Sequence, residues 1–510
     1  MDTQAFISQF QLLNKQSNKT QNKQITILGA GIAGLVAAYE LERLGHSVEI
    51  LEGSPRVGGR VWTHRFSKEA NSPYAELGAM RIPSEHQHTL HYVREMGLSD
   101  KLRKFVTVFE EQNAFMNLEG KIFRMKDAPR LLQEREQGIF SDSRYAQQTR
   151  LFAAWLKTII NTIAPQQLRD EFNRDLESHL MDELERLDLG KYFSPDGEGI
   201  DINSFIKENP SFRARTSKAL DMFLDDIVTE TSHDLLQIEG GTSLLIDRLV
   251  ESIKAPITCN AEIVAIEVLD NNQTEITWKQ DGQVHTKRCD YVLCTIPFSV
   301  LRKMELKGFD ERKLESINNI TYCPATKVAF HTKEAFWQNQ GINGGASFSG
   351  EGVRQTYYPS VKFNPNTGAS LLASYTIGDD ANKMAMMSES DRHAYVKNIV
   401  SKVHPELAQP GMIKEAASIA WGNYKWSAGG CTVHWHGDDS HRQINYLEAA
   451  RPQNTLFFAG EHCSKYPAWL QGSIESTLEA VRDIVAHNPQ TTVNNTVAFT
   501  RVVKTPAFVA

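Results

Sequence analysis

ITILGAGIAGLVAAYELERLGHSVEILEGS, residues 25–54, contains three segments with different patterns. ITIL (25–28) is a short apolar run of the kind that forms a buried parallel strand, and SVEILE (47–52) is predicted to be a second strand. Between them, LVAAYELERLG (35–45) has apolar residues at helical spacing and ends on Gly45, a residue type that often terminates helices. The order strand, helix, strand predicts a βαβ unit.

Gly29, Gly31 and Gly34 form a GxGxxG motif at the turn between the first strand and the helix. In such a motif the first glycine permits the tight turn and the second lets the backbone approach a pyrophosphate. The third lets the helix pack close to the sheet, so that its N-terminus faces the phosphates. Glu52 ends the second strand, near the position about 20 residues on where a carboxylate binds a ribose hydroxyl. The motif predicts a dinucleotide site but does not distinguish NAD from FAD.

The rest of the chain shows two further patterns. Residues 125–236 are rich in Leu, Arg, Glu and Asp, with apolar residues recurring every three or four positions, which predicts a helical region. From residue 261, apolar and polar residues alternate and NN and DG turns separate the runs, which predicts a β meander. LFFAG (456–460) is predicted to be a buried strand and SIESTLEAVRDIVAHN (473–488) an amphipathic final helix.

The composition excludes several classes of function. The 510 residues suggest roughly two to four domains. A net charge of −7 gives no basic surplus for binding nucleic acid. The six cysteines form no CxxC pair, so they are expected to be reduced thiols. The histidines of HQHTLH (86–91) and HWHGDDSH (434–441) have irregular spacing, so no metal site is predicted.

The N-terminal segment is polar and lacks the apolar core of a signal peptide. No run of about 18 apolar residues occurs, so no membrane span is expected. Together these features predict a cytoplasmic location.

EGSPRVGGRVWT (52–63) continues past Glu52 with the pattern ExxxRxGGR. This pattern resembles the flavin-dependent amine oxidase superfamily. The resemblance recurs over almost the whole chain, at IEGGTSLL (238–245), AEIVAIEV (261–268), DYVLCTIPFSVL (290–301) and LFFAGEHCSKYPAWLQGSIESTLEAVRD (456–483). Within that superfamily, GAMRIP (78–83), TKVAF (326–330) and ASYTIGDDA (373–381) are similar to the FAD-dependent L-amino acid oxidases.

The resemblance implies an α/β fold whose substrate part is α+β. It implies a Rossmann-like FAD/NAD(P)-binding domain of the GR2 type, a sheet-rich substrate-binding domain and a helical insertion. The expected boundaries are an N-terminal arm at 1–23, an FAD-binding domain at 24–70, 237–304 and 446–487, a substrate-binding domain at 71–124 and 305–445, a helical domain at 125–236 and a C-terminal tail at 488–510.

Arg81 is a permanent cation inside the small, apolar stretch YAELGAMRIP (74–83). The resemblance implies that its planar guanidinium binds the substrate carboxylate bidentately. It also implies that the Tyr375 hydroxyl supports that carboxylate, that the Ala468 carbonyl accepts from the substrate amine, and that Trp469 forms one wall. The residues alone leave another interpretation open, in which Arg81 forms a structural ion pair with Glu76 or another carboxylate.

Lys327, in PATKVAF (324–330), matches the family lysine that holds a water near the flavin N5. The resemblance implies that it assists the oxygen half-reaction. The alternative is a solvated lysine at the edge of a strand.

The resemblance also implies a set of FAD contacts. Arg60 neutralises the pyrophosphate, Val264 meets the adenine through its backbone, and Glu461 meets the ribityl chain and pyrophosphate. The complete expected set is Gly29, Gly31, Ile32, Ala33, Gly34, Glu52, Gly53, Arg60, Gly78, Ala79, Met80, Arg81, Val264, Glu461, Ala468, Trp469, Leu470, Gln471, Gly472 and Ser473.

The implied reaction is oxidative deamination of an L-amino acid to a 2-oxo acid, with release of ammonia and hydrogen peroxide and O2 as electron acceptor. The alternatives are an amino acid 2-monooxygenase, which decarboxylates its substrate to an amide, an amine or polyamine oxidase, and a flavin-binding scaffold without catalysis. The family expectation for assembly is a homodimer or a higher homo-oligomer.

Two positions depart from the L-amino acid oxidase pattern. Cys431 lies in SAGGCTVHW (427–435), and monoamine oxidases attach their flavin to a cysteine in a similar GGC context. The two interpretations are a covalent flavin and a buried thiol, and the second is favoured because buried cysteines are common and inert. Ala468 replaces the glycine usual before the tryptophan, which leaves the side-chain preference open.

Overall fold

The computed structural model describes Thr3, Ser8 and residues 22–69, 72–128, 131–132, 141–194, 199–360, 367–433 and 439–487. Most of the predicted N-terminal arm, the predicted C-terminal tail, and positions 434–438 of the second histidine-rich stretch lie outside the described residues.

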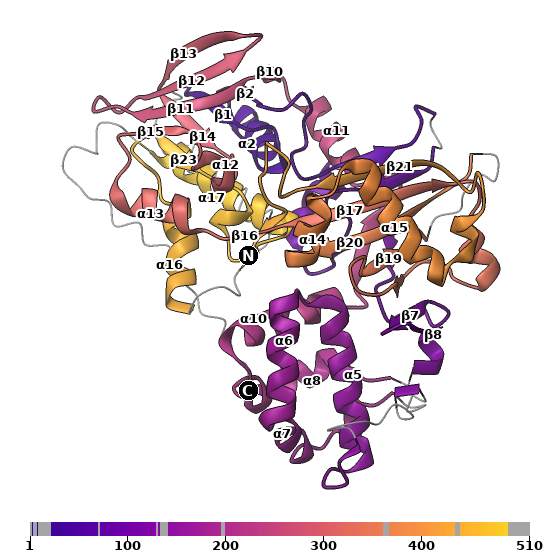
Figure 1. The fold of residues 1–510 in the computed structure, drawn as a ribbon. Coiled ribbons are helices and arrows are strands. Elements are labelled where there is room, and N and C mark those ends of the chain that lie inside the picture. Colours follow the sequence, from indigo (N-terminus) through magenta and orange to yellow (C-terminus); the bar gives the residue numbers. More distant parts are fainter. Residues whose placement is uncertain are drawn as a thin grey trace.

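A five-stranded parallel sheet is built from segments far apart in the chain (Figure 1). Its order is β10 (Ile257–Thr258), β2 (Ser47–Leu51), β1 (Gln24–Leu28), β14 (Tyr291–Cys294), β23 (Leu456–Phe458). Helix α2 (Ile32–Arg43) connects β1 to β2 and packs against α17 (Leu470–Ala486). Because helices cover such a sheet, its central strands are almost continuously apolar, as ITIL is in β1. The predicted α/β class is confirmed.

Two glycines of the GxGxxG motif allow the turn between β1 and α2. Gly29 has a φ of +105°, in the left-handed region that favours glycine. A Cβ at Gly34 would lie 2.0 Å from the carbonyl oxygen of Gly29, so a side chain there would force the helix away from the strand. Gly34 therefore sets the close packing of α2 on β1.

The meander predicted from residue 261 is present. Strands β11 (Glu262–Val268), β12 (Thr274–Gln280) and β13 (Gln283–Cys289) pair in antiparallel order, and β15 (Glu305–Lys307) joins parallel to β11. The turn between β12 and β13 uses Asp281 and Gly282, both with positive φ, as a two-residue hairpin turn requires.

A seven-stranded sheet forms a second layer. Its order is β21 (Ile413–Ala420), β17 (Ala325–Thr332), β20 (Ala369–Ile377), β19 (Gln355–Tyr357), β18 (Ala346–Phe348), β7 (Phe115–Leu118), β8 (Lys121–Arg124). Strand β17 is an interior strand, and its register with β20 places Lys327 directly opposite Tyr375. The two predicted site residues are therefore neighbours on adjacent strands.

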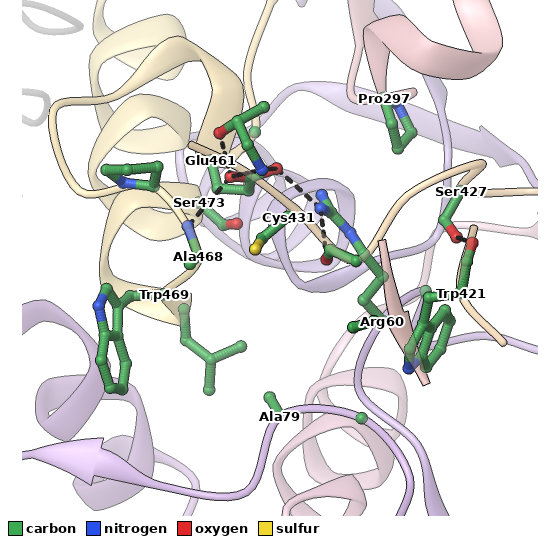
Figure 2. Close-up of a pocket in the computed structure, with 18 of the residues that line it drawn as sticks. Arg60, Ala79, Pro297, Trp421, Ser427, Cys431, Glu461, Ala468, Trp469 and Ser473 are labelled. Atoms are coloured by element: carbon green, nitrogen blue, oxygen red, sulfur yellow. Dashed lines mark hydrogen bonds and ion pairs between the residues drawn. The ribbon is translucent and has the colours of Figure 1, made fainter. Parts of the chain in front are cut away.

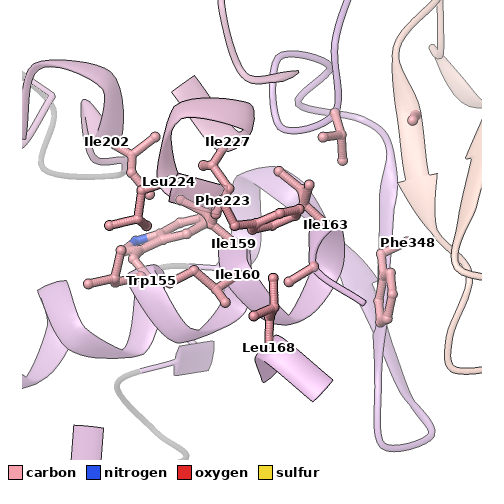
Figure 3. Packing of buried hydrophobic residues seen from close by; sticks show 14 of the residues in the cluster. Trp155, Ile159, Ile160, Ile163, Leu168, Ile202, Phe223, Leu224, Ile227 and Phe348 are labelled. Atoms are coloured by element: carbon pink, nitrogen blue, oxygen red, sulfur yellow. The ribbon is translucent and has the colours of Figure 1, made fainter. Parts of the chain in front are cut away.

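Helices form a separate lobe at the bottom of Figure 1. They are α5 (Gln147–Ile163), α6 (Gln166–Asp175), α7 (Met181–Glu185), α8 (Ile202–Glu208), α9 (Pro210–Arg213) and α10 (Lys218–Glu230). Figure 3 shows Trp155, Ile159 and Ile160 of α5 packed against Leu224 and Ile227 of α10. Phe348 of β18 belongs to the same apolar cluster, so the helices share a core with the seven-stranded sheet.

The remaining α-helices and strands of the described residues lie around these layers. They are β3 (Thr63–Arg65), β4 (Tyr74–Glu76), β5 (Ile82–Pro83), α3 (Gln87–Glu95), β6 (Leu102–Lys104), β9 (Leu235–Ile238), α11 (Ser243–Ser252), α12 (Phe298–Leu301), α13 (Glu311–Asn319), β16 (Tyr322–Cys323), α14 (Gly378–Ala385), α15 (Glu389–Val403), β22 (Cys431–Thr432) and α16 (Asp439–Ala450). Of the helices within the described ranges, none is both long enough and apolar enough to cross a membrane.

Replacing Gly34 by alanine is expected to destabilise the protein. The added methyl group would overlap the Gly29 carbonyl oxygen, and forced displacement of this kind costs about 2 kcal/mol. Thermal unfolding should show a Tm lower by about 2 °C. Gly422→Ala is the matched control, because its Cβ would make an ordinary 3.4 Å contact with Pro324. Equal Tm values for the two variants would contradict the role given to Gly34.

Candidate active site

A cavity of about 640 Å³ lies where the parallel sheet, the seven-stranded sheet and helix α10 meet. Its wall includes the β1–α2 turn, the end of β2, residues 78–81, strand β17 and the start of α17. The volume is within the range of about 300–1,000 Å³ that holds small molecules and cofactors. The cavity therefore collects the predicted dinucleotide and substrate residues in one place.

The N-terminus of α2 forms one end of the cavity. Gly31, Ile32 and Ala33 line it, and no side chain caps the first turn of the helix. A Cβ added at Gly31 would come no nearer than 4.0 Å to the Cα of Gly59, so the space above Gly31 is open. Uncapped backbone N–H groups at a helix N-terminus attract anions. This end of the cavity fits a pyrophosphate.

The Glu52 carboxylate accepts hydrogen bonds from two backbone segments, the β1–α2 turn and the loop after β2. Its Oε2 accepts from the N–H of Ala30 at 2.7 Å and its Oε1 from the N–H of Ser54 at 2.8 Å. Each carboxylate oxygen has a second lone pair, so the group keeps capacity to accept from a hydroxyl. Gly53 is required beside it, because a Cβ there would lie 2.4 Å from the Trp426 ring. The fixed carboxylate fits a ribose.

Arg60 forms a buried ion pair with Glu461, at 2.7 Å between Nη1 and Oε1 (Figure 2). Glu461 Oε2 also accepts from the backbone N–H groups of Thr432 and Ala468, both at 3.1 Å. Burial raises the pKa of Glu461, but Arg60 and the other donors outweigh it and hold the pKa at about 2. The sequence did not predict this pair, and the pyrophosphate contact of Arg60 stays a prediction.

Arg81 is buried in the cavity wall, with 6% of its side chain exposed. Its Nη2 pairs with Glu230 at the end of α10, its Nη1 donates to the Tyr357 hydroxyl at 3.4 Å, and the guanidinium lies 5.8 Å from the Trp469 ring centre. Burial lowers the pKa of Arg81, but Glu230 outweighs it and raises the pKa above its ordinary value. Arg81 is therefore both ion-paired and in contact with the cavity.

Glu76, the partner considered for Arg81, has other contacts. Its carboxylate accepts from the Thr242 N–H at 2.6 Å and from the Thr63 hydroxyl at 2.9 Å. The carboxylate that Arg81 contacts comes instead from the helical lobe.

Lys327 lines the cavity and is 4% exposed, so it is not a solvated lysine at a strand edge. Its Nζ donates to the carbonyl oxygens of Gly78 at 2.7 Å and Glu76 at 3.2 Å, and lies 4.7 Å from the centre of the Tyr375 ring. Burial lowers the pKa of Lys327 to about 7, and the nearby positive charge of Arg81 also lowers it. Lys327 can therefore hold or release a proton near neutral pH.

Most predicted site residues line this cavity. They are Gly29, Gly31, Ile32, Ala33, Glu52, Gly53, Arg60, Gly78, Ala79, Met80, Arg81, Lys327, Tyr375, Glu461, Ala468, Trp469, Leu470 and Ser473.

Four predicted cofactor residues lie outside the cavity lining: Gly34, Val264, Gln471 and Gly472. The side chain of Gln471 accepts from the Thr89 N–H at 3.1 Å. A Cβ at Gly472 would lie 2.0 Å from the Tyr466 carbonyl oxygen, so this glycine serves packing.

In strand β11 the residue that lines the cavity is Ile263, one position before Val264. The pairing of β11 with β12 shifts register between Ile263 and Ala265, so Val264 sits at a β-bulge. A bulge adds one residue and breaks the alternation of faces along the strand. The adenine contact of the Val264 backbone stays a prediction.

Glu230 and Tyr357 are the contacts of Arg81 that sequence reasoning missed. Glu230 is 149 residues from Arg81 in the chain, and no local motif marks it. The two meet because β5, directly after Arg81, pairs with β9 with Ile82 opposite Leu236, and α10 ends shortly before β9. Only the pairing of distant segments reveals this contact.

The structure describes both positions that depart from the L-amino acid oxidase pattern, Cys431 and Ala468. Cys431 lines the cavity, opposite Cys323 in the β16–β22 pair. Burial raises the pKa of the Cys431 thiol well above its ordinary value, so the thiol is protonated and a poor nucleophile, which favours the buried-thiol interpretation. Ala468 has a φ of +64°, in the left-handed region where glycine is the usual residue.

The family model for flavin containing amine oxidoreductase matches residues 32–485. A flavin-dependent L-tryptophan oxidase, RebO of Lentzea aerocolonigenes, is 45% identical over 466 residues, which cover 91% of this chain and 98% of that protein. The putative L-amino-acid oxidase YobN of Bacillus subtilis is 28% identical, covering 92% of this chain and 96% of that protein.

A solved structure of putrescine oxidase bound to putrescine has a TM-score of 0.61 at 16% identity, covering 91% of this chain and 99% of that chain. At this identity the likeness shows the fold alone. The family match covers most of the chain. The glycine turn after β1, the Glu52 carboxylate and the cavity that they line fit a flavin dinucleotide. The chain belongs to the family of flavin-containing amine oxidoreductases.

Proposed function

We propose that this protein is an L-amino acid oxidase, which converts an L-amino acid, water and O2 to a 2-oxo acid, ammonia and hydrogen peroxide. The observation that carries the proposal is the buried guanidinium of Arg81 in the cavity wall. A guanidinium fork matches an α-carboxylate, which an amine or polyamine substrate lacks. Tyr375 and Lys327 line the same cavity.

The cofactor is FAD, as expected for this family, and the residues present fit it. Gly31 leaves room for the pyrophosphate at the α2 N-terminus, Glu52 accepts from the adenosine ribose, and Arg60 supplies positive charge. FAD, when bound, supplies the acceptor for the hydride equivalent that leaves the α-carbon of the substrate.

The chain holds the substrate at three points. Arg81 and the Tyr375 hydroxyl bind the carboxylate, the Ala468 carbonyl accepts from the amine, and Trp469 forms a wall for the side chain. These groups come from different segments of one cavity wall, so they fix the α-carbon in space. A three-point hold of this kind accepts the L enantiomer and excludes the D enantiomer.

Lys327 acts in the oxygen half of the reaction. Its Nζ is anchored to the Gly78 carbonyl, beside the segment 78–81 that lines the cavity. With a pKa of about 7, the ammonium can position a water and pass a proton where dioxygen is reduced.

The preferred substrate is proposed to carry a large aromatic side chain, such as that of tryptophan. The support is the 45% identity with a protein named an L-tryptophan oxidase. Ile163, Met222 and Phe223 of the helical lobe and Ile377 at the end of β20 also offer apolar surface in the cavity. The cytoplasmic location and the assembly as a homodimer or a higher homo-oligomer stay predictions.

The proposal is tested by measuring peroxide and ammonia release with all L-amino acids, several D enantiomers and the corresponding decarboxylated amines. We expect equal amounts of peroxide and ammonia from L-amino acids only, with L-tryptophan among the best. Oxidation of amines but not amino acids would contradict the role of Arg81. Carbon dioxide and an amide with little peroxide would identify the monooxygenase.

Arg81→Lys is expected to raise KM for L-amino acids about 100-fold, because lysine keeps the charge but loses the two-pronged hydrogen bond. Steady-state kinetics on FAD-loaded protein provide the measurement. Arg65→Lys is the matched control, because Arg65 donates to the Gly240 carbonyl and does not line the cavity, and it should leave KM unchanged. An unaltered KM for the amino acid would place the carboxylate elsewhere in the cavity.

Lys327→Met is expected to lower kcat/KM for O2 about 100-fold, since an assisting proton donor is lost, while reduction of the bound flavin by the amino acid changes less. Stopped-flow absorbance separates the two half-reactions. Lys313→Met is the matched control: Lys313 is also buried with a pKa lowered to about 7, but it does not line the cavity. Equal losses in both variants would refute a specific role for Lys327.

A further inference from the structure

Glu230 contributes a carboxylate to the place where the proposed function needs a substrate carboxylate. It is the last residue of α10, it lines the cavity, and it pairs with Nη2 of Arg81. The side chains of Arg81 and Glu230 are 6% and 18% exposed, so the pair is largely withdrawn from water. The anchor for the substrate is thus already occupied by an internal anion.

The neighbours of Glu230 are the other substrate groups. Glu230, Tyr375 and Lys327 all line the same cavity. Arg81, the partner of Glu230, also donates to the Tyr357 hydroxyl at 3.4 Å. Its backbone position is fixed by the β5–β9 pairing on one side and by α10 on the other.

We propose that Glu230 is a specificity-determining residue, an internal carboxylate that occupies Arg81 until a substrate carboxylate displaces it and that disfavours ligands without a positive group. The inference rests on the proposed function, because it takes Arg81 as the carboxylate anchor.

Displacement of Glu230 from Arg81 by a substrate carboxylate favours ligands that also carry a positive charge. In the free protein Arg81 and Glu230 neutralise each other. A zwitterionic amino acid brings one carboxylate for Arg81 and one ammonium, on the adjacent carbon, for the displaced Glu230. All four charges then have an opposite partner within a few bond lengths, and the exchange leaves the net charge of the cavity unchanged.

The 2-oxo acid product does not bring a positive charge to balance its carboxylate. It carries the carboxylate but no ammonium, so its binding to Arg81 leaves the displaced Glu230 as an unpaired anion in a buried site. An uncompensated buried charge is strongly unfavourable. Glu230 therefore favours substrate over product at the same anchor, and it promotes release of the product after each turnover.

Direct binding of benzoate, a carboxylate without an amine, tests the inference without turnover. The FAD-loaded wild type, Glu230→Gln and Glu230→Ala are titrated with benzoate, and the change in visible flavin absorbance gives Kd. Both variants lack the competing charge, so benzoate should bind about tenfold more tightly to each. The KM for the L-amino acid should not fall in parallel, because the ammonium loses its partner.

Two further variants serve as controls. Glu230→Asp keeps the charge and should bind benzoate as weakly as the wild type. Asp221→Asn makes the same change of charge on α10, where Asp221 bonds to Arg213 and does not line the cavity, and should leave Kd unchanged. Unchanged or weaker benzoate binding in both neutral variants would overturn the proposal. Because binding is read without catalysis, that result is distinct from an absence of amino acid oxidation, which would overturn the proposed function.

Discussion

The buried ion pair between Arg60 and Glu461 is the interaction on which the cavity depends. Its partners lie 401 residues apart in the chain, and the same carboxylate accepts from the backbone of Thr432 and Ala468. One side chain thus fixes three wall segments: the loop after β2, strand β22 and the turn before α17. Removing either charge would leave the other unpaired in a buried site, which is far more costly than losing an exposed pair.

The sequence predicted those parts of the protein that local patterns determine. The βαβ unit, the meander and the cavity positions of Arg81 and Lys327 follow from apolar periodicity, glycine spacing and family motifs. Glu230 was missed because its contact with Arg81 depends on the pairing of β5 with β9, which no local pattern specifies. At strand β11 the cavity is lined by Ile263, beside a β-bulge, and the adenine contact of Val264 that the family resemblance implies stays a prediction.

The helical lobe is joined to the seven-stranded sheet by charges as well as by apolar packing. Arg354 donates from Nη2 to the carbonyl oxygens of Thr162 and Ala164 at the end of α5, at 2.8 and 3.1 Å, a favourable place for a cation. Arg169 of α6 pairs with the buried Asp380 at 3.2 Å. These contacts attach α5 and α6 to the sheet, and α10 packs on α6. Under the proposed function, the parallel sheet would provide the cofactor end of the cavity and the lobe would shape the substrate end.

The scattered origin of the parallel sheet has a consequence for biosynthesis. Strands β1 and β2 leave the ribosome early, whereas β23, Glu461 and α17 come from residues 456–486. At about 5–20 residues per second, the N-terminal βαβ unit waits tens of seconds for the strand and helix that complete its core. During that interval its apolar faces are uncovered and the ion-pair partner of Arg60 does not exist. The cofactor site is consequently complete only after residues 456–486 have been synthesised, and the uncovered apolar faces of the βαβ unit are exposed to aggregation until then.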